Sequence, residues 1–244
     1  MERKGGRPAD ELRPISFDRR YLKHAHGSCL VRQGDTVVLC AANIVDGVSA
    51  WRRGSEAGWI TAEYSLLPAA THTRTRREAS AGKQTGRTLE IQRLIGRSLR
   101  SVVDLGGMGG EYTMYVDCDV IQADGGTRTA AISGAYVAML DAFETWKSAG
   151  KISSVPVFGS VAAVSVGVVD GEVLLDLDYD EDSAAEVDMN VVMDGSGRFI
   201  EVQGTAEASP FDRDRLDEML DLAAKGIARI RQIQDEALAE GAGD

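Results

Sequence analysis

The sequence predicts a mixed α/β (α+β) fold in which mixed sheets pack against helices. Several segments alternate β-branched or apolar residues with polar ones on either side of short turns, which is typical of paired strands. Other segments repeat apolar residues at helical spacing. Each half of the chain, 10–150 and 151–238, runs from strands into a helix. We therefore expect an internal duplication within one domain over 1–244, closed by a flexible tail over 239–244.

The first half is expected to contain three strands and two helices. Leu89, Leu94, Ile95 and Leu99 recur at the spacing of one helical face, which places a helix after the first strand pair. In chain order, the expected elements are a strand pair over 27–44 around the turn Gly34-Asp35, a loop-rich stretch over 45–86, a helix from Arg87 to about Val103, a strand over 114–122, and a helix over about 130–148.

The second half is expected to contain two strand pairs and a long closing helix. Acidic residues near the start of that helix, such as Asp212 and Asp214, favour the helix N-terminus because they complement its dipole. In chain order, the expected elements are a strand pair over 161–179 around Asp170-Gly171, a hairpin over 188–207 with its turn between Gly195 and Gly197, and a helix over about 212–238.

Composition and charge limit the classes of function. The sequence has no apolar run long enough to span a membrane, and its charged N-terminal segment does not resemble a signal peptide. Cys29, Cys40 and Cys118 lie in apolar segments without CxxC spacing, so we expect reduced core residues in a cytoplasmic protein. The net charge of −11 disfavours non-specific binding of nucleic acid over the whole surface.

Basic residues gather in one part of this acidic chain, over residues 71–100. This local patch suits a protein that holds phosphates at one place. The basic residues there, against only Glu78 and Glu90, are Arg74, Arg76, Arg77, Lys83, Arg87, Arg93, Arg97 and Arg100.

A glycine-rich loop, Gly125-Gly126-Thr127-Arg128-Thr129, lies between a predicted strand and a predicted helix. Glycines let backbone N–H groups approach an anion, and the helix N-terminus adds a favourable dipole. Thr127 and Arg128 add a hydroxyl and a guanidinium that suit phosphate. The pattern is not a Walker P-loop, and a plain turn with an exposed arginine remains the alternative.

Two further groups of charged residues are candidates for chemistry. Arg93, Arg97 and Arg100 share one helical face, either as an anion-binding stripe or as a solvated or interface stripe, while Arg87 at the helix start opposes the dipole unless an anion is bound. The acidic run from Asp176 to Asp188 suits a metal, acid–base chemistry or a polar loop between strands. It lacks the EF-hand glycine, because Glu181 stands there.

The sequence lacks the patterns of the common nucleophilic hydrolases. His24, His26 and His72 are the only histidines, and neither HExxH nor GxSxG occurs. Phosphate-holding groups together with carboxylates, without a nucleophile signature, indicate phosphoryl or nucleotidyl transfer.

These motifs resemble the ribonuclease PH family of phosphorolytic 3′→5′ exoribonucleases. The resemblance covers about residues 10–235 and rests on long ordered stretches: GWITAEYSLLPAATHTRTRREA, GRTLEIQRLIGRSLR, DCDVIQADGGTRTAAISGAYVA, and LDLDYDEDSAAEVDMNVVM. It implies a duplicated ribosomal-protein-S5-domain-2-like fold and a homohexamer built as a trimer of dimers. It also implies a tRNA nucleotidyltransferase that trims 3′ extensions of tRNA precursors, releases nucleoside 5′-diphosphates and can run in reverse, with a place in tRNA and rRNA processing.

The resemblance also implies roles for single residues. Arg87, Gly126, Thr127 and Arg128 would bind the inorganic phosphate that serves as co-substrate. Asp182 and Asp188 would be the catalytic carboxylates, as a general acid or as ligands of Mg²⁺. Arg74, Arg76 and Arg77 would bind the acceptor end of tRNA. Arg93 and Arg97, together with Arg100, would guide the 3′ strand of the RNA or brace subunits.

Two other functions stay open at this point. An inactive ring subunit that only supports RNA binding would lose residues of the phosphate site or the carboxylates, yet Arg87, Thr127, Arg128, Asp182 and Asp188 are all present. A phosphorylase of small nucleosides would leave the basic segment over 74–77 unexplained.

Overall fold

The computed structural model describes residues 3–207 and 209–240 and contains two sheets packed with helices. The first part of the chain contains β1 (Ile15–Arg19), β2 (Gly27–Gln33), β3 (Thr36–Asp46), β4 (Trp59–Leu66), α1 (Glu78–Ala81), α2 (Gly86–Arg100), β5 (Tyr112–Gln122) and α3 (Thr127–Ser148). The second contains β6 (Val161–Val169), β7 (Glu172–Leu175), α4 (Tyr179–Ala184), β8 (Val187–Asp194), β9 (Phe199–Ala206) and α5 (Arg213–Glu240). Short 3-10 turns lie at Lys4–Gly6, Ala50–Arg52 and Gly106–Met108.

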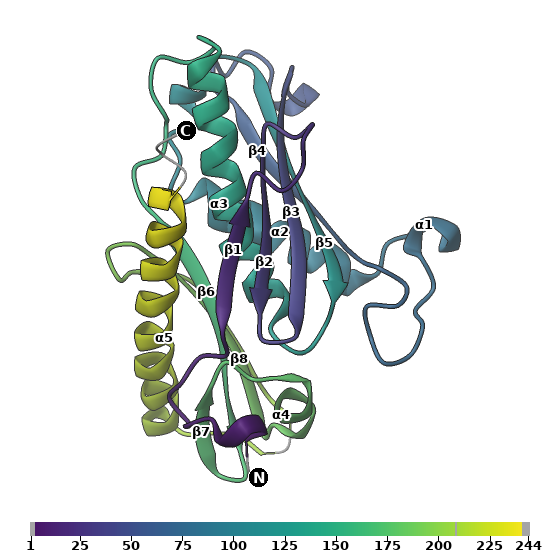
Figure 1. The fold of residues 1–244 in the computed structure, drawn as a ribbon, viewed down its shortest axis with the longest axis vertical. Helices are drawn as coiled ribbons and strands as arrows, with labels where there is room; N and C mark the ends of the chain where they lie inside the picture. Colours follow the sequence, from purple (N-terminus) through teal and green to yellow (C-terminus); the bar gives the residue numbers. More distant parts are fainter. Residues whose placement is uncertain (1–2, 208, 241–244) are drawn as a thin grey trace.

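The first sheet has five strands in the order β1-β2-β3-β5-β4. Its pairs are antiparallel except for β4 and β5, which run parallel. A parallel pair needs a crossover, and α2 supplies it while packing on β4. Because α3 packs on β2 and β3, both helices cover the same face of this sheet (Figure 1).

The second sheet is antiparallel, in the order β7-β6-β8-β9. Every residue of β6 is buried because α3 packs on this strand as well as α5. The helix α3 thus lies between the two sheets (Figure 1). It is buried on nearly all sides, and its own buried residues include small apolar ones such as Ala130, Ala131 and Ala135. One core therefore joins the two sheets.

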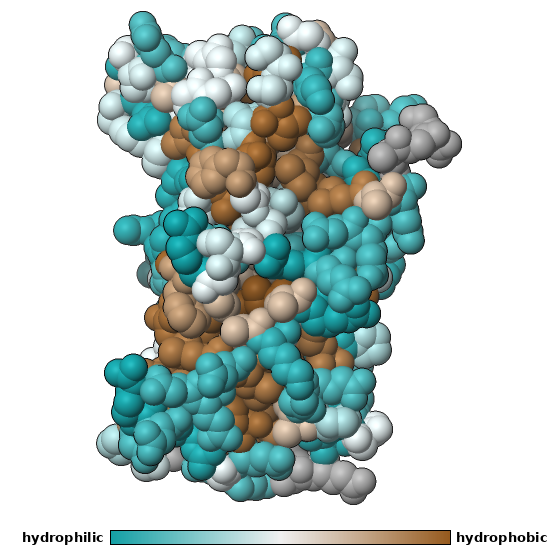
Figure 2. All heavy atoms as spheres, turned by 90° about the vertical axis from the view of Figure 1, so that its left-hand side faces the viewer, coloured by the Kyte–Doolittle hydropathy of each residue, from teal (hydrophilic) through white to brown (hydrophobic). Residues whose placement is uncertain are grey.

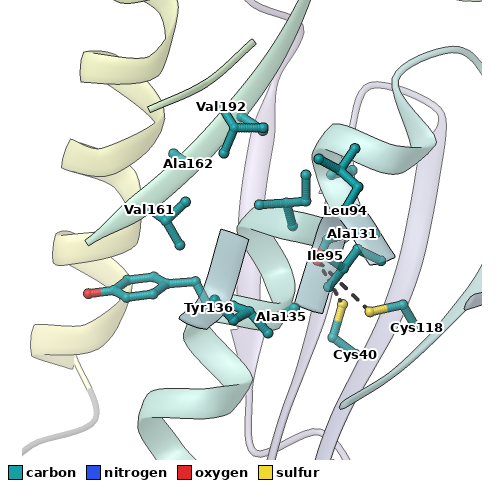
Figure 3. Close-up of a cluster of buried hydrophobic side chains, with 14 of the residues drawn as sticks. Cys40, Leu94, Ile95, Cys118, Ala131, Ala135, Tyr136, Val161, Ala162 and Val192 are labelled. Carbon is teal, nitrogen blue, oxygen red and sulfur yellow. Dashed lines mark hydrogen bonds between the residues drawn. The ribbon is translucent and has the colours of Figure 1, made fainter. Parts of the chain in front are cut away.

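All three cysteines are free thiols in this core, as predicted. Cys40 on β3 and Cys118 on β5 both point at the carbonyl oxygen of Ala131 in α3, at 3.7 and 4.0 Å (Figure 3). Burial raises the pKa of the Cys29 thiol well above its ordinary value, which keeps this thiol protonated and unreactive.

The predicted mixed α/β class is confirmed, and most predicted elements are present. The prediction of a loop-rich stretch over 45–86 is wrong in part, because these residues contain β4, whose side chains Ile60, Ala62 and Tyr64 are buried. The strand β1 was not predicted. The helix α3 begins at Thr127 and not near 130, which moves part of the expected loop into the first helical turn. The helix α5 continues to Glu240, so residues 239–240 are not a tail, and residues 241–244 lie outside the described residues.

The surface is mainly polar, with apolar side chains showing between polar ones on the side where α5 lies (Figure 2). Within residues 3–207 and 209–240, the model contains no helix with the length and apolar character that a membrane crossing requires.

A buried network of ion pairs fastens the N-terminal segment to the second sheet. Arg13 donates from Nη2 to Oδ1 of Asp176 at 2.6 Å and from its backbone N–H to Oδ2 at 2.8 Å, and Asp176 is fully buried. Arg3 makes a two-point contact with Glu181, at 2.7 and 2.9 Å, and Arg7 reaches the same carboxylate at 3.0 Å. Two carboxylates of the acidic segment after β7, Asp176 and Glu181, are therefore paired with three arginines from the start of the chain.

Replacing Arg13 by Ala should lower the free energy of unfolding by about 3–5 kcal/mol, because it removes the closest cation from the buried carboxylate of Asp176 and leaves only Arg7, at 3.9 Å, as its charged partner. Urea unfolding followed by circular dichroism measures this change. Lys4→Ala is the matched control: it breaks an exposed pair with Asp35 and should leave the free energy of unfolding nearly unchanged. Equal losses in the two variants would contradict the central role given to the buried pair.

Candidate active site

The loop after β5 is shaped by two glycines in left-handed conformation, Gly125 at φ +73° and Gly126 at φ +63°. A Cβ on Gly125 would lie 2.4 Å from the carbonyl oxygen of Leu177, so only glycine permits this approach. Thr36 fastens the loop from the other side, donating from Oγ1 to the carbonyl oxygen of Gly125 at 2.6 Å. The loop therefore sets the start of α3 directly against the segment that leads into α4.

The first turn of α3 presents donors to this junction. Its N-cap, Gly126, has no side chain to cap the helix, which leaves the first N–H groups available for an anion. Thr127 accepts a hydrogen bond from the hydroxyl of the buried Tyr64 at 2.8 Å, so its own hydroxyl proton is available to another group. Arg128 uses only Nη1 within the described chain, donating to Gln203 at 2.7 Å and to Glu90 at 3.5 Å. Its other guanidinium donors remain for a ligand.

Arg87 stands in the first turn of α2. That turn is capped by Thr85, whose Oγ1 accepts from the N–H of Thr88 at 3.2 Å, and Thr88 donates in turn to Glu78 at 2.7 Å. The Arg87 side chain itself is exposed, and the structure records neither a hydrogen bond nor an ion pair for it with the residues described. A cation in this unfavourable place, with no hydrogen-bonding partner among the described residues, is suited to binding an anion.

The acidic run is divided by the fold into structural and available carboxylates. Asp176 and Glu181 are held by arginines, and Asp178 is the N-cap of α4, where it forms a capping box with Glu181. The run is thus not a polar loop between strands, because a helix begins inside it. The side chains of Asp182 and Asp188 make no hydrogen bond within the part of the chain that the structure describes, and both face a cavity.

One cavity brings the predicted phosphate-binding and catalytic residues together. It has a volume of about 230 Å³, and its lining includes Arg87, Gly126, Thr127, Arg128, Asp182 and Asp188. We call it the site cavity. These residues come from α2, from the loop before α3 and the first turn of α3, and from α4 and β8, elements of both sheets.

Residues that the sequence did not single out also line the site cavity or a second cavity that adjoins it. Asn190, on β8 beside Asp188, faces both cavities, and the second is lined further by Gln203, Thr205 and Glu207. Asn190 follows Asp188 by two residues, so both side chains lie on the same face of the strand. That period is the signal by which the sequence could have identified Asn190.

Both available carboxylates have raised pKa values. Partial burial raises the pKa of Asp182, and the positive charges of Arg87 and Arg128 oppose this rise. Partial burial also raises the pKa of Asp188, with a further rise from the negative charge of Asp182. Each carboxyl group therefore holds a proton to a higher pH than usual, which suits an acid that must give one up near neutrality.

The other predicted RNA-binding arginines lie outside the site cavity. Arg97 forms a two-point ion pair with Glu201, both contacts at 2.9 Å, and Arg93 is exposed on α2. Arg100 stacks on the ring of Trp59 at 4.3 Å and donates to the carbonyl oxygen of Ile60. Arg97 and Arg100 therefore stabilise contacts within the chain. That they also bind RNA stays a prediction.

Arg74, Arg76 and Arg77 lie in the segment between β4 and α2. They are exposed, and the segment extends away from the body of the molecule together with α1 (Figure 1). Arg76 donates to the carbonyl oxygen of Ser80 at 2.7 Å, and Arg77 borders a separate cavity whose lining includes Asp117 and Asp119. The segment is accessible to a large ligand that approaches the site cavity.

Asp182 and Asp188 also fit the needs of Mg²⁺. This ion is usually bound through one or two carboxylates, with water and substrate phosphate completing its shell, and both carboxylates lack hydrogen-bonding partners in the described chain. Among the residues that the structure describes, no three His, Cys, Asp or Glu side chains cluster as a metal site.

Asp188→Asn should raise the melting temperature at pH 7.5. The folded-state pKa of Asp188 lies above its ordinary value, so the ionised group weakens the folded state once the pH exceeds that pKa. The gain should disappear as the pH falls below the ordinary aspartate pKa, about 3.9, where this carboxyl group is protonated in the folded and the unfolded chain alike. Differential scanning calorimetry across this range measures the effect.

Asp194→Asn is the matched control with the opposite sign. Although partial burial opposes it, hydrogen bonds from Ser196 and Arg198 hold the pKa of Asp194 well below its ordinary value. Its ionised form therefore stabilises the protein at pH 7.5, and this variant should melt at a lower temperature than wild type. A lower melting temperature for Asp188→Asn as well would contradict the inferred environment of Asp188.

Comparisons with known proteins place this geometry in a family. Residues 11–143 match the model of domain 1 of the 3′ exoribonuclease family, and residues 159–226 match that of domain 2. The fold is similar to that of rice (Oryza sativa) Rrp46, at 23% identity and TM-score 0.77, over 96% of this chain and 98% of that one.

The fold is also similar to two archaeal structures. One is an Archaeoglobus fulgidus exosome with RNA bound to the active site, at 23% identity and TM-score 0.81, over 95% of this chain and 92% of that one. The other is an archaeal exosome core, at 21% identity and TM-score 0.75, over 94% and 90%. With both domain models matched in order along the sequence, this chain belongs to the 3′ exoribonuclease family.

Proposed function

We propose that the protein is a phosphate-dependent 3′→5′ exoribonuclease, a tRNA nucleotidyltransferase that trims 3′ extensions of tRNA precursors. The observation that carries this proposal is the site cavity, where the donors of Arg87, Arg128 and the first turn of α3 face Asp182 and Asp188. The reaction must hold two anions together, inorganic phosphate and the scissile phosphodiester. A cavity lined both by guanidinium donors that remain for a ligand and by carboxylates meets this need.

In the proposed reaction, Arg87, Arg128, the Thr127 hydroxyl and the first N–H groups of α3 hold inorganic phosphate. An oxygen of this phosphate attacks the phosphorus that joins the last nucleotide to the chain. The bond from that phosphorus to the 3′-oxygen of the preceding nucleotide breaks, giving a nucleoside 5′-diphosphate and an RNA one nucleotide shorter. Asp182 or Asp188, with its raised pKa, gives a proton to the leaving 3′-oxygen. In the alternative, the same two residues would be ionised ligands of Mg²⁺, which would stabilise negative charge on that oxygen in place of a proton.

Reversal of these steps adds nucleotides when diphosphates are in excess, because the bonds exchanged are similar. The guanidinium donors that hold inorganic phosphate then hold the terminal phosphate of the incoming diphosphate. The carboxylate that gave the proton takes one from the attacking 3′-hydroxyl.

The proposal extends to the RNA and to the assembly. The exposed segment with Arg74, Arg76 and Arg77 would contact tRNA precursors and other structured RNA, including rRNA, while Arg93 and Arg97 would guide the 3′ strand. We further propose a homohexamer arranged as a trimer of dimers, with two related halves in each chain. A cytoplasmic location agrees with three free, buried thiols.

A second candidate function is favoured by the similarity to exosome structures, namely a ring subunit that binds RNA without catalysing its cleavage. Such a subunit has no need of paired carboxylates beside an anion site. In this chain Arg87, Arg128, Asp182 and Asp188 are present and line one cavity, which favours the enzyme.

Arg87→Ala should raise the phosphate concentration needed for half-maximal rate by about 10- to 100-fold, since a hydrogen bond to a charged group contributes about 1.5–3 kcal/mol. Binding of tRNA should persist, because Arg87 lies apart from the basic segment over 74–77. Initial rates measured against phosphate concentration give the comparison. Arg213→Ala, on an exposed arginine of α5, is the control and should behave as wild type. An unchanged phosphate requirement in Arg87→Ala would remove this residue from the site.

A further inference from the structure

Two aromatic side chains meet at the edge of the site cavity. His72 lies in the segment after β4, and Tyr179 is the first residue of α4. Their ring centroids are 5.0 Å apart, with an angle of 41° between the ring planes. The pair therefore joins the segment that carries the basic residues to the helix that carries Asp182.

Neither ring has another evident role within the protein. Tyr179 is 47% exposed and His72 is exposed as well. Among the residues that the structure describes, no hydrogen bond reaches the hydroxyl of Tyr179 or the imidazole nitrogens of His72. His26 shows the contrast, because its Nδ1 accepts from the N–H of Ile44 at 3.0 Å and its ring packs on Trp146. Two exposed rings, whose polar atoms make no hydrogen bond with the described residues, are suited to a ligand that stacks.

The lining of the site cavity combines two kinds of chemistry. Its lining includes Tyr179, Leu66, Ala123 and Thr71 as well as the arginines and carboxylates. A nucleotide has the same division, with a flat base that stacks and a charged phosphate. The hydroxyl of Thr71 already donates to the carbonyl oxygen of Thr73 at 2.8 Å, so its proton is not offered to a base edge.

We propose that His72 and Tyr179 form a stacking platform for the nucleobase of the 3′-terminal nucleotide, and thereby set its phosphodiester between the anion site and the carboxylates. This inference rests on the proposed function, since it assigns the terminal base of that reaction's RNA. Stacking uses the π face that every base has, so the platform accepts all four bases and discriminates against an end that lacks a base.

The test is equilibrium binding of a single-stranded RNA whose 3′-terminal base is 2-aminopurine, measured by fluorescence without phosphate. Wild type should quench the fluorescence on binding. Tyr179→Ala should abolish the quenching and weaken binding by about 5- to 100-fold, while Tyr179→Phe should retain both. Tyr21→Ala is the matched control, because Tyr21 is 53% exposed and lies between β1 and β2, at the opposite end of β2 from the Gly34 turn and the Thr36 contact with Gly125.

A second RNA, identical except for an abasic 3′-terminal nucleotide and followed, like the first, through the anisotropy of a 5′ fluorescein, separates stacking from general loss of fold. Wild type should bind this RNA about as weakly as Tyr179→Ala binds the normal one, and the variant should lose nothing further. His72→Ala should show the same pattern to a smaller degree. Equal losses for Tyr179→Ala on both RNAs, or unaltered quenching in that variant, would overturn the platform.

Assays of nucleotide release with the same proteins separate this inference from the proposed function. If wild type releases nucleoside diphosphates with phosphate while Tyr179→Ala binds and quenches like wild type, the platform is wrong and the function stands. If wild type releases no nucleotide but shows quenching that Tyr179→Ala abolishes, the platform stands and the proposed reaction is wrong.

Discussion

The buried pair of Arg13 and Asp176 is the interaction on which the rest of the site depends. Asp176 adopts a left-handed backbone at φ +58°, which few residues other than glycine favour, and it accepts bonds from Arg13 and from Gln33 at 2.7 Å. Arg13 also donates to the carbonyl oxygen of Asp124, next to the glycine loop. One arginine thus connects the segment before β1, the loop before α3 and the segment that begins α4. The separation between Asp182 and the phosphate-holding donors follows from that connection.

The residues of the candidate site could be predicted because their chemistry is local in sequence. Two glycines, a threonine and an arginine between a strand and a helix indicate anion binding wherever the helix lies. Strand periodicity and turn residues likewise identified both hairpins of the second sheet and the pair β2 and β3. The resemblance to a known family then selected Arg87, Asp182 and Asp188 from many charged residues, and the fold places all three in one cavity.

Features that depend on partners far away in the chain could not be predicted from periodicity. Asp176 and Arg13 are 163 residues apart, so the sequence showed a costly acidic run but not the arginines that neutralise it. Arg97 forms its ion pair with Glu201, 104 residues away in sequence. The strand β4 is likewise defined by its pairing with β5, which is distant in sequence. His72 and Tyr179, likewise distant in sequence, become a pair only when α4 is docked against the segment that follows β4.

The central claim is that phosphate, held by arginines and a helix N-terminus, attacks the last phosphodiester of an RNA chain. Incubating the purified protein with a 3′-extended tRNA precursor, with and without phosphate, and identifying the released nucleotide tests this claim most directly. The account predicts nucleoside 5′-diphosphates that appear only when phosphate is present. Nucleoside monophosphates released without phosphate would contradict the account, because water would then be the attacking group and the anion role of Arg87 and Arg128 would have no basis.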